Sequence, residues 1–520
     1  MPALTATAAV AIDKRSLAIK VAFRIAVLAA TLYGLLQRLP GWNPASLWLD
    51  DEWVGIVVRR MSLPDFFHLR PPVPIGFVVV ERALSSIFLD PEWSLQIFPF
   101  VCGVALIPLL SLLALQLGAS KSVAIFAAVC AATSPMSSEL SVRVKQYSSD
   151  TLTVTLLLLA GLPLLAKYSR RGALDYCLAS LLAALFSFPS VFISVSIVHV
   201  AAATHWARSR SWRALLPVLA FDLALLALWQ VMLRGQSSQA MREYWSGHYM
   251  PLEPSAALGF LRNSGYYALK TAFPQGLAAM LWLLPLGIYD LAQRPRTRGL
   301  ALVIVLLAAA LICASGLRMY PLGGGRTDSF MHPVVILCVA CGVNRLKTWL
   351  AQLTDHAQPL AELVPLALAW LLLWPGLKVG IHAVYPPSGD AKVIQAVERS
   401  MQPSDGLIIS PHGTISVGHY GSWPLRFVPW DAYAHNFHVH IERPNTLGLS
   451  PYTDYWQHPE LLEPELSTFL KTDYPRVFFI AAGWAHASDR DFTIKRIVER
   501  GYTLVQQVRS GDARALLFTR

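Results

Sequence analysis

The sequence predicts a polytopic α-helical membrane protein with a C-terminal α/β domain outside the membrane. Of the 520 residues, 54% are hydrophobic and only 14% are charged, and the mean hydropathy is +0.46. Soluble globular proteins carry about 25% charged residues, so these values exclude an ordinary soluble protein. Basic residues gather in every second loop between apolar segments, and residues 386–520 have a different, alternating pattern.

About eleven transmembrane helices are predicted from windows of roughly 20 apolar residues, the length that crosses a bilayer. The apolar run Tyr176–Trp206 is too long for one crossing, and Phe188-Pro189-Ser190 divides it. The first apolar run lacks a credible cleavage site and is expected to be a retained span. The predicted spans are 17–37, 95–117, 122–138, 151–166, 173–188, 190–206, 214–233, 273–292, 299–317, 328–344 and 360–380.

The basic loops predict which ends of the spans face the cytoplasm. With a cytoplasmic N-terminus, residues 38–94, 139–150, 234–272 and 318–327 lie outside, and an odd number of crossings puts the C-terminal tail outside as well. All six cysteines fall within or at the edge of apolar spans, so no disulfide framework is expected. The cytoplasmic loops are marked by Lys14, Arg15, Lys121, Lys167, Arg170, Arg171, Arg208, Arg210, Arg213, Arg294, Arg296, Arg298, Arg345 and Lys347.

The tail, residues 386–520, is predicted to form an extracytoplasmic α/β domain that follows a membrane domain of residues 1–385. No GxGxxG or Walker loop occurs, so no nucleotide cofactor is expected. Strands are expected at Gly406–Ser410, Arg426–Val428, Arg476–Ala481, Tyr502–Val505 and Ala513–Phe518, and helices at Ala391–Met401, Glu460–Lys471 and Asp489–Arg500.

The most informative motif is the acidic triplet Asp50-Asp51-Glu52, within the first outer loop at residues 38–94. Carboxylates are costly beside hydrocarbon, so three adjoining ones at a membrane edge indicate a function. One interpretation is a helix cap, since acids favour a helix N-terminus. The other is catalysis, because a carboxylate can take the proton of an attacking hydroxyl group.

Several outer-loop motifs together resemble the membrane glycosyltransferases of the GT-C fold, and most closely family 39, which includes protein O-mannosyltransferases and lipid A aminoarabinose transferases. The resemblance covers residues 45–345 and extends in architecture to the tail. Its motifs are Leu47-Trp-Leu-Asp-Asp-Glu52, Arg70-Pro-Pro-Val-Pro-Ile-Gly-Phe77, Pro91-Glu-Trp-Ser-Leu-Gln-Ile-Phe-Pro99, Ser134-Pro135 with Glu139, Lys145-Gln-Tyr-Ser-Ser-Asp150, and Tyr320-Pro-Leu-Gly-Gly-Gly-Arg326.

This resemblance implies an inverting glycosyltransferase in a bacterial inner membrane. Such an enzyme moves one sugar from a polyprenyl-phosphate donor to a lipid, glycan or protein acceptor on the periplasmic face. Membrane lipids are further partners, and nucleic acid is not, because the net charge of +11 is concentrated in short loops. The alternatives are a transporter or flippase of lipid-linked sugars, for which paired half-repeats are expected and none is visible, and a non-catalytic scaffold, which leaves the triplet unexplained.

The resemblance also implies the catalytic residues. The family has an Asp-Glu pair, whereas three acids stand here, so the register has two solutions. We assign the general base to Asp51, with Glu52 completing the pair, and Asp50 is the alternative. A second carboxylate of the triplet either orients the acceptor or holds a divalent metal ion.

Cations in two outer loops are candidate ligands of the donor phosphate, whose charge grows as it leaves. Lys145 either binds phosphate or snorkels at a span end. Arg326 follows Gly323-Gly-Gly325, which allow close backbone approach to a phosphate or simply form a flexible hairpin. Arg318 is a weaker candidate, and Tyr147 either bonds the donor or anchors at the interface.

Acceptor-orienting or metal-binding roles are assigned to Asp150, Glu139 and His68. Asp150 is either that acid or a helix N-cap, and His68 is displaced from its position in the family. For His435, His438 and His440 a polar loop is favoured over a metal site, and Asp222 is expected to pair across the bundle. Loop 234–272 is rich in aromatic residues that either stack on sugars or anchor at the interface, namely Tyr244, Trp245, Tyr266 and Tyr267.

Overall fold

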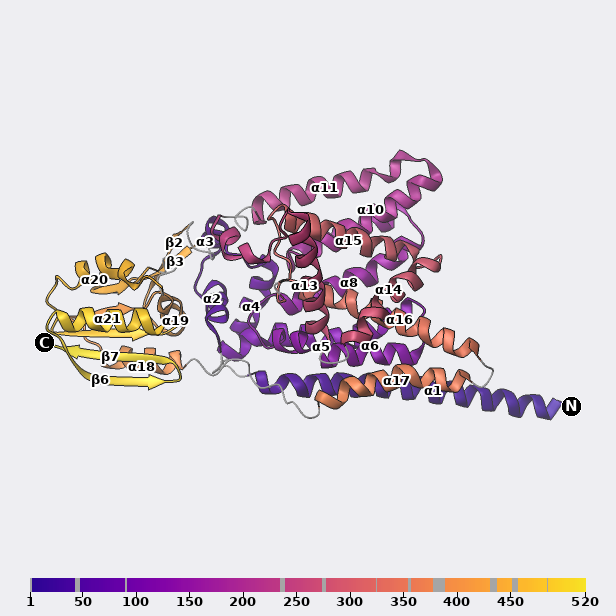
Figure 1. The fold of residues 1–520 in the computed structure, drawn as a ribbon, viewed down its shortest axis with the longest axis horizontal. Helices are drawn as coiled ribbons and strands as arrows, with labels where there is room; N and C mark the ends of the chain where they lie inside the picture. Colours follow the sequence, from indigo (N-terminus) through magenta and orange to yellow (C-terminus); the bar gives the residue numbers. More distant parts are fainter. Residues whose placement is uncertain are drawn as a thin grey trace.

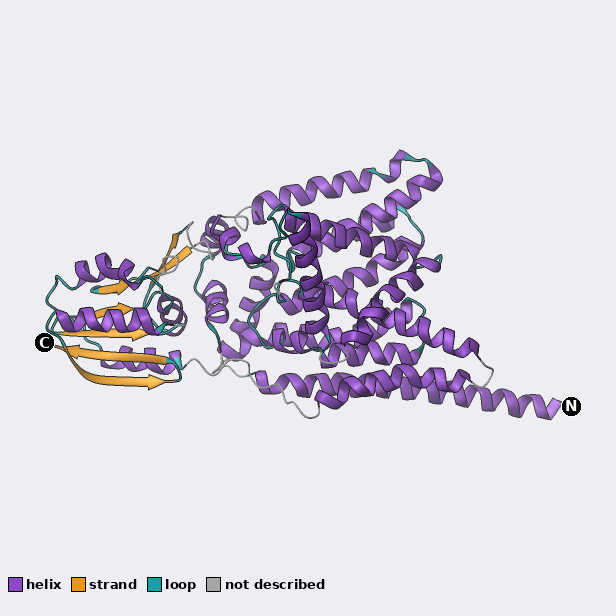
Figure 2. Ribbon diagram, in the orientation of Figure 1, coloured by secondary structure: helices purple, strands orange, loops and turns teal. Residues whose placement is uncertain are grey.

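The computed structural model contains a helical membrane domain and an α/β domain at one end of it (Figures 1 and 2). It describes residues 2–42, 47–88, 91–233, 239–273, 277–323, 325–353, 357–376, 389–430, 437–450, 457–483 and 485–520. Both parts of the predicted fold class are therefore present.

Each predicted span overlaps a helix. By length and composition, seven described helices can cross a membrane, and two shorter ones are also apolar. The count of about eleven crossings stays a prediction. The helices are α1 (Pro2–Arg38), α5 (Pro91–Gln116), α6 (Lys121–Thr133), α8 (Tyr147–Ala166), α9 (Arg170–Ala184), α10 (Ser190–Ser209), α11 (Leu216–Leu228), α14 (Leu277–Gln293), α15 (Arg298–Gly316), α16 (His332–Leu353) and α17 (Ala357–Gly376).

Two predicted spans, 122–138 and 173–188, are too long at their outer ends, because their helices end at Thr133 and Ala184. Helix α6 stops at Thr133 because Ser134 precedes a proline and takes an extended conformation. Pro135 then begins the short helix α7 (Pro135–Leu140), where the Ser134 hydroxyl oxygen accepts a bond from the Ser137 N–H. Residues 134–140 therefore belong to the second outer loop.

The outer loops are largely helical, which the sequence did not predict in detail. Figure 1 shows α2, α3 and α4 between the bundle and the C-terminal domain. The loop helices are α2 (Leu49–Arg59), α3 (Leu63–Leu69), α4 (Ile75–Ile87), α12 (Gln239–Tyr244) and α13 (Pro254–Ala272). Shorter helical turns lie at Leu39–Gly41, Trp229–Leu233, Ser246–His248 and Ser329–Met331 on the same side, and at Trp212–Ala214 in the basic α10–α11 loop at the opposite end.

The C-terminal domain is built on a five-stranded sheet of order β4-β1-β5-β7-β6. Strand β1 is parallel to β4 and β5, whereas β7 is antiparallel to β5 and β6; β2 and β3 form a separate antiparallel pair. The strands are β1 (Gly406–Ile409), β2 (Leu425–Pro429), β3 (Phe437–Ile441), β4 (Thr446–Gly448), β5 (Arg476–Ala481), β6 (Thr503–Ser510) and β7 (Ala513–Thr519), and the helical segments are α18 (Asp390–Ser400), α19 (Gly413–Tyr420), Pro459–Leu462, α20 (Glu463–Phe469) and α21 (Ala487–Glu499).

All five expected strands and three expected helices of the tail are present, and α19, β3 and β4 are additional. Helix α19 and strand β3 pack on α2. The Trp53 ring lies 5.7 Å from the Phe437 ring, and Ile415 and Val439 complete that apolar cluster. The Arg60 guanidinium donates to the carbonyl oxygens of residues 421 and 423 at 2.9 and 2.7 Å. The C-terminal domain is thus attached to the first outer loop.

The basic loops lie at the end of the bundle far from this domain. In Figure 1 the N-terminus, the α10–α11 turn and the C-terminal end of α16 are all at that end. Within the bundle, Asp222 pairs with His199 at 3.3 Å, as expected. The structure therefore segregates the basic loops from the C-terminal domain, whereas the orientation in the membrane remains a prediction.

That orientation is tested with single cysteines at two exposed serines. A cysteine replacing Ser422, in the C-terminal domain, should react with an impermeant maleimide in cells whose outer membrane is permeabilised. A cysteine replacing Ser169 lies in the basic α8–α9 loop, which the positive-inside rule places in the cytoplasm. It should react only after lysis, because the impermeant reagent cannot cross the inner membrane. Labelling of the Ser169 position in intact cells would reverse the topology.

Candidate active site

The three acids of the triplet lie in the first turn of α2 and contact three different regions. The Asp51 carboxylate accepts a bond from the Trp48 N–H at 3.2 Å, which caps the helix. A helix N-terminus favours nearby negative charge, so the capping interpretation is correct for this residue. It does not account for the other two acids.

Asp51 ties α2 to the second outer loop. Its carboxylate accepts bonds from Arg143 Nε at 2.8 Å and from the Val144 N–H at 3.0 Å. The residue is 1% exposed. A carboxylate that is paired on all sides and closed to solvent is poorly placed to take a proton from a substrate, so this geometry does not suit our assignment of Asp51 as the base.

Glu52 points to the C-terminal domain instead. It is completely buried, and its Oε2 accepts a bond from the Ser416 hydroxyl at 2.6 Å. Burial, and next the charge of Asp390, raise the pKa of Glu52 well above its usual value. Glu52 is therefore an interdomain contact and does not line the cavity at the outer ends of the spans.

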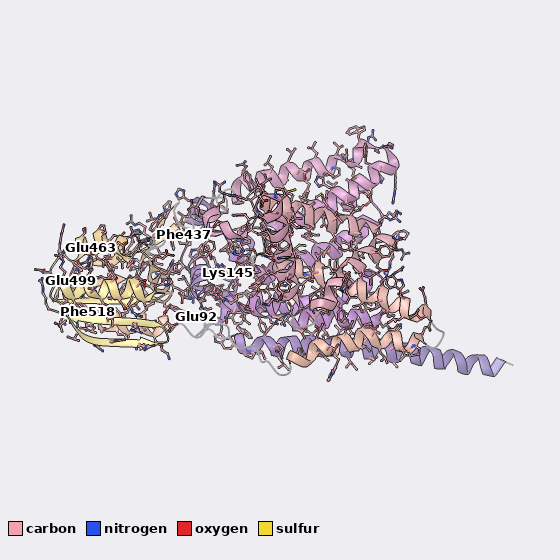
Figure 3. The ribbon with its side chains drawn as sticks, viewed as in Figure 1. Glu92, Lys145, Phe437, Glu463, Glu499 and Phe518 are labelled. Carbon is pink, nitrogen blue, oxygen red and sulfur yellow. The ribbon has the colours of Figure 1, made fainter. Side chains whose placement is uncertain are left out.

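The third acid, Asp50, faces a cavity of about 570 Å³ at the outer ends of the spans. Three cations and a second acid share this cavity with many aromatic side chains. In Figure 3 the labelled Lys145 lies between the bundle and the C-terminal domain. The lining residues are Asp50, Pro72, Lys145, Gln146, Tyr147, Asp150, Phe188, Pro189, Val191, Phe192, Trp229, Arg242, Tyr244, Trp245, Tyr249, Ala314, Met319, Tyr320, Pro321, Arg326 and Thr327.

Asp50 is paired with the two cations that the sequence selected. Arg326 Nη1 donates to its Oδ2 at 2.8 Å, and Lys145 Nζ lies 4.0 Å from the same oxygen. Arg326 also donates to the Tyr244 hydroxyl at 3.0 Å, and Lys145 lies over the Trp53 ring at 5.0 Å. Burial lowers the pKa of Lys145, and the Asp50 charge opposes that shift. The structure thus brings Asp50, Lys145 and Arg326 together.

Other predicted residues separate into two groups. Tyr147 and Asp150 line the cavity, and one Asp150 oxygen is buried without a hydrogen-bond partner. Arg318 and His68 are exposed and do not line it, and Glu139 lies outside the lining, half-buried near Arg143 and Arg326, where burial raises its pKa. The roles assigned to Arg318, His68 and Glu139 therefore receive no support from position.

The sequence missed one cation, Arg242, because it lies on a short helix inside loop 234–272. The aromatic richness of that loop was the available signal. Tyr244, Trp245 and Tyr249 line the cavity, whereas Tyr266 and Tyr267 do not. Arg242 became relevant only when the fold brought α12 over the outer ends of α8 and α10.

Metal binding is not supported by a side-chain cluster in the described part of the chain. Within it, no group of three or more His, Cys, Asp or Glu residues is arranged to hold a metal ion. His435 lies outside the described residues. His438 is buried, and burial lowers its pKa to about 4. A divalent metal ion stays an untested prediction.

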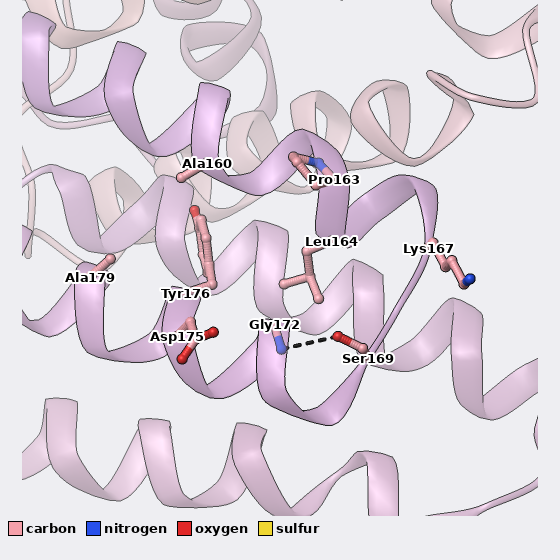
Figure 4. A pocket seen from close by; sticks show the side chains of 9 residues that line it. All are labelled: Ala160, Pro163, Leu164, Lys167, Ser169, Gly172, Asp175, Tyr176 and Ala179. Atoms are coloured by element: carbon pink, nitrogen blue, oxygen red, sulfur yellow. Dashed lines mark hydrogen bonds between the residues drawn. The ribbon is translucent and has the colours of Figure 1, made fainter.

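A smaller cavity of about 290 Å³ lies at the other end of α8, between α8 and α9 (Figure 4). Its wall is mainly small and apolar, and the Gly172 N–H donates to the Ser169 hydroxyl at its edge. It contains one cation, Lys167, and one acid, Asp175. The larger outer cavity is therefore the candidate active site.

No protein-family model matches the sequence, and no curated protein sequence matches it. Solved structures do match the fold. The crystal structure of ArnT from Cupriavidus metallidurans in the apo state is 12% identical, with a TM-score of 0.56 over 97% of this chain and 98% of that chain. The same protein bound to undecaprenyl phosphate gives 12% identity and a TM-score of 0.52 over 96% and 98%. ArnT is a lipid A aminoarabinose transferase of the GT-C fold, so the predicted fold is confirmed.

The contact between Asp51 and Arg143 gives a stability prediction. Arg143→Ala should lower the free energy of unfolding by about 3–5 kcal/mol, because it leaves the buried Asp51 charge without its cation. The matched control is Arg171→Ala, which removes an exposed ion pair to Asp175 and should change little. Thermal unfolding in detergent measures both, and equal midpoints would contradict the structural role of Asp51.

Proposed function

We propose that this protein is an inverting glycosyltransferase that takes its sugar from a polyprenyl-phosphate donor. The observation that carries the proposal is the outer cavity, in which Asp50 lies beside Lys145 and Arg326, and Arg242 is a further lining cation. Cations suit a phosphate group, aromatic walls suit a sugar and an isoprenoid chain, and a carboxylate suits proton removal. The GT-C fold is consistent with this chemistry but does not establish it.

The reaction follows from these groups. An acceptor hydroxyl attacks the anomeric carbon from the face opposite the phosphate, and Asp50 takes its proton. The bond between the anomeric carbon and the phosphate oxygen breaks as the new glycosidic bond forms, which inverts the configuration. The polyprenyl monophosphate leaves with increased negative charge, and the fixed cations stabilise that charge.

Arg326 connects donor binding to the base. Its guanidinium already bonds Asp50 and Tyr244. A donor phosphate that enters the cavity competes for these N–H groups and shifts part of Arg326 away from Asp50. The carboxylate then has a lone pair to accept the acceptor proton, so the base is engaged only when the donor is bound.

The transporter alternative fits the cavity less well. Transporters of that kind place substrate near the bilayer midplane, between broken helices. Here the lining residues Tyr147, Pro189 and Trp229 stand at the outer ends of α8, α10 and α11. A site at that level meets an acceptor in the outer leaflet or the periplasm, which is the location we propose for the reaction in a bacterial inner membrane.

The proposal is tested on whole cells. Mass spectra of envelope lipids, glycans and proteins from cells with and without this chain should differ by one sugar mass on one acceptor. Fragment ions then identify the sugar and the acceptor. Native membranes, which contain the sugar donor and the acceptor, can then be used for activity assays. Identical spectra under conditions where the protein is present in the membrane would contradict the proposal.

Asp50→Asn should lower kcat by about 10²- to 10⁴-fold, the usual contribution of a general base. Undecaprenyl phosphate binding, followed by tryptophan fluorescence, should be retained or tighter, because Asp50 no longer competes for Arg326. The matched control is Asp65→Asn, a half-buried acid on α3 whose carboxylate accepts a bond from the Ser62 hydroxyl. Wild-type turnover in Asp50→Asn would place the base elsewhere.

Lys145→Ala and Arg326→Ala should each lower kcat/KM for the lipid-phosphate donor. The lost charge-assisted contact is worth about 1.5–3 kcal/mol, which is about ten- to a hundredfold. Arg242→Ala should have an effect in the same direction, whereas Arg318→Ala should leave kcat/KM unchanged, because Arg318 does not line the cavity. Equal losses for Arg318 and Arg326 would rule out a specific phosphate site.

A further inference from the structure

The membrane domain and the C-terminal domain share a buried hydrogen-bonded chain of two carboxyl groups and one hydroxyl group. Ser416 Oγ on α19 lies 2.6 Å from Glu52 Oε2 on α2 and 2.9 Å from Asp390 Oδ2 on α18. The N–H of residue 483 donates to that same Asp390 oxygen at 3.1 Å. Glu52 and Ser416 are 0% exposed and Asp390 is 3% exposed.

The hydrogen bonds among Glu52, Ser416 and Asp390 need one more proton than the serine hydroxyl provides. A serine hydroxyl carries a single hydrogen, and an ionised carboxylate only accepts hydrogen bonds. Ser416 therefore cannot donate to Glu52 and Asp390 at once when both are ionised. Two carboxylates in one buried site also repel each other, which favours a shared proton. The contacts are complete only when one of the two carboxyl groups is protonated.

The surroundings favour that protonated state. Burial raises the pKa of Asp390 to about 6, and burial together with the Asp390 charge raises the pKa of Glu52 well above its usual value. His419, next to this site on α19, is buried, and burial lowers its pKa to about 3, so it is neutral. The other titratable groups that act on the two carboxyls or on their neighbour Tyr420 are the acids Asp51, Glu92 and Asp512.

We propose that Asp390 and Ser416 of the C-terminal domain are positioning residues for the active site, which hold Glu52 through a shared proton and so fix the first turn of α2. Asp51 secures the same turn from the other side through Arg143. Asp50 is then held toward the cavity between these two attachments. The catalytic consequence rests on the proposed function, whereas the contact itself does not.

The shared proton makes the attachment dependent on pH. A raised carboxyl pKa means that the docked state binds the proton more tightly than the undocked state. The stabilisation is complete below the ordinary carboxyl pKa and is lost as the pH rises through the raised value. The first turn of α2 should therefore be held firmly at acidic pH and loosen at alkaline pH. Glutamine at position 52 supplies a hydrogen that does not titrate.

The test is hydrogen exchange of the full-length protein in detergent with phospholipid, read on peptides from α2. After correction for intrinsic rates, wild-type α2 amides should exchange about tenfold faster or more near pH 8.5 than near pH 5.5, since one pKa unit is a factor of ten. Glu52→Gln should be protected at both pH values, and Ser416→Ala should exchange fast at both. Peptides from α8 are the internal control, and Asp65→Asn is the matched acid-to-amide control.

A pH-independent wild-type profile, or Glu52→Gln with the wild-type pH dependence, would overturn the proposal. These two measurements decide it even when Ser416→Ala fails to fold. A merely structural Glu52 would lose protection in Glu52→Gln at every pH. Where sugar transfer is measurable, kcat of the wild type should decline at alkaline pH, and Glu52→Gln should lose that decline. Absence of any sugar transfer would contradict the proposed function and leave the exchange test intact.

Discussion

Consecutive residues of an α-helix project about 100° apart, and the arrangement of the outer face of this protein depends on that constraint at α2. Three adjacent acids in one turn cannot share one environment. Asp51 turns to Arg143 in the second outer loop, Glu52 turns to Ser416 in the C-terminal domain, and Asp50 turns to the cavity. One helical turn thereby joins three parts of the molecule.

Buried charge explains why this turn must be held so tightly. An ionised group removed from water is costly unless it is paired and hydrogen-bonded. Asp51 meets this requirement with a cation and two N–H groups. Glu52 meets it with a hydroxyl and a proton, since no cation is among the groups that shift its pKa. The two solutions differ, because only the second one includes a proton that the site can lose as the pH rises.

The charged side chains of the cavity are also paired with one another. Asp50 and Arg326 satisfy each other before any ligand is present, and aromatic rings cover the cations from several sides, including Trp245 over Arg326 at 5.5 Å. A donor phosphate can therefore replace the Asp50 carboxylate as the partner of Arg326 without leaving the Arg326 guanidinium unpaired. This exchange of partners connects the binding of an anionic donor to the availability of a base.

The sequence by itself determined the membrane class, the helical segments, the strands of the tail and the general location of the site, because hydrophobic periodicity and charge placement are local properties. It also selected Asp50, Lys145, Tyr147, Asp150 and Arg326, which do line one cavity. Tertiary structure alone decided which acid of the triplet faces that cavity, and it alone added Arg242 to the cations that line the cavity. Those choices depend on the direction of each side chain and on loops far apart in the chain, such as α12 and α19, whose approach to α2 is set by packing and not by local pattern.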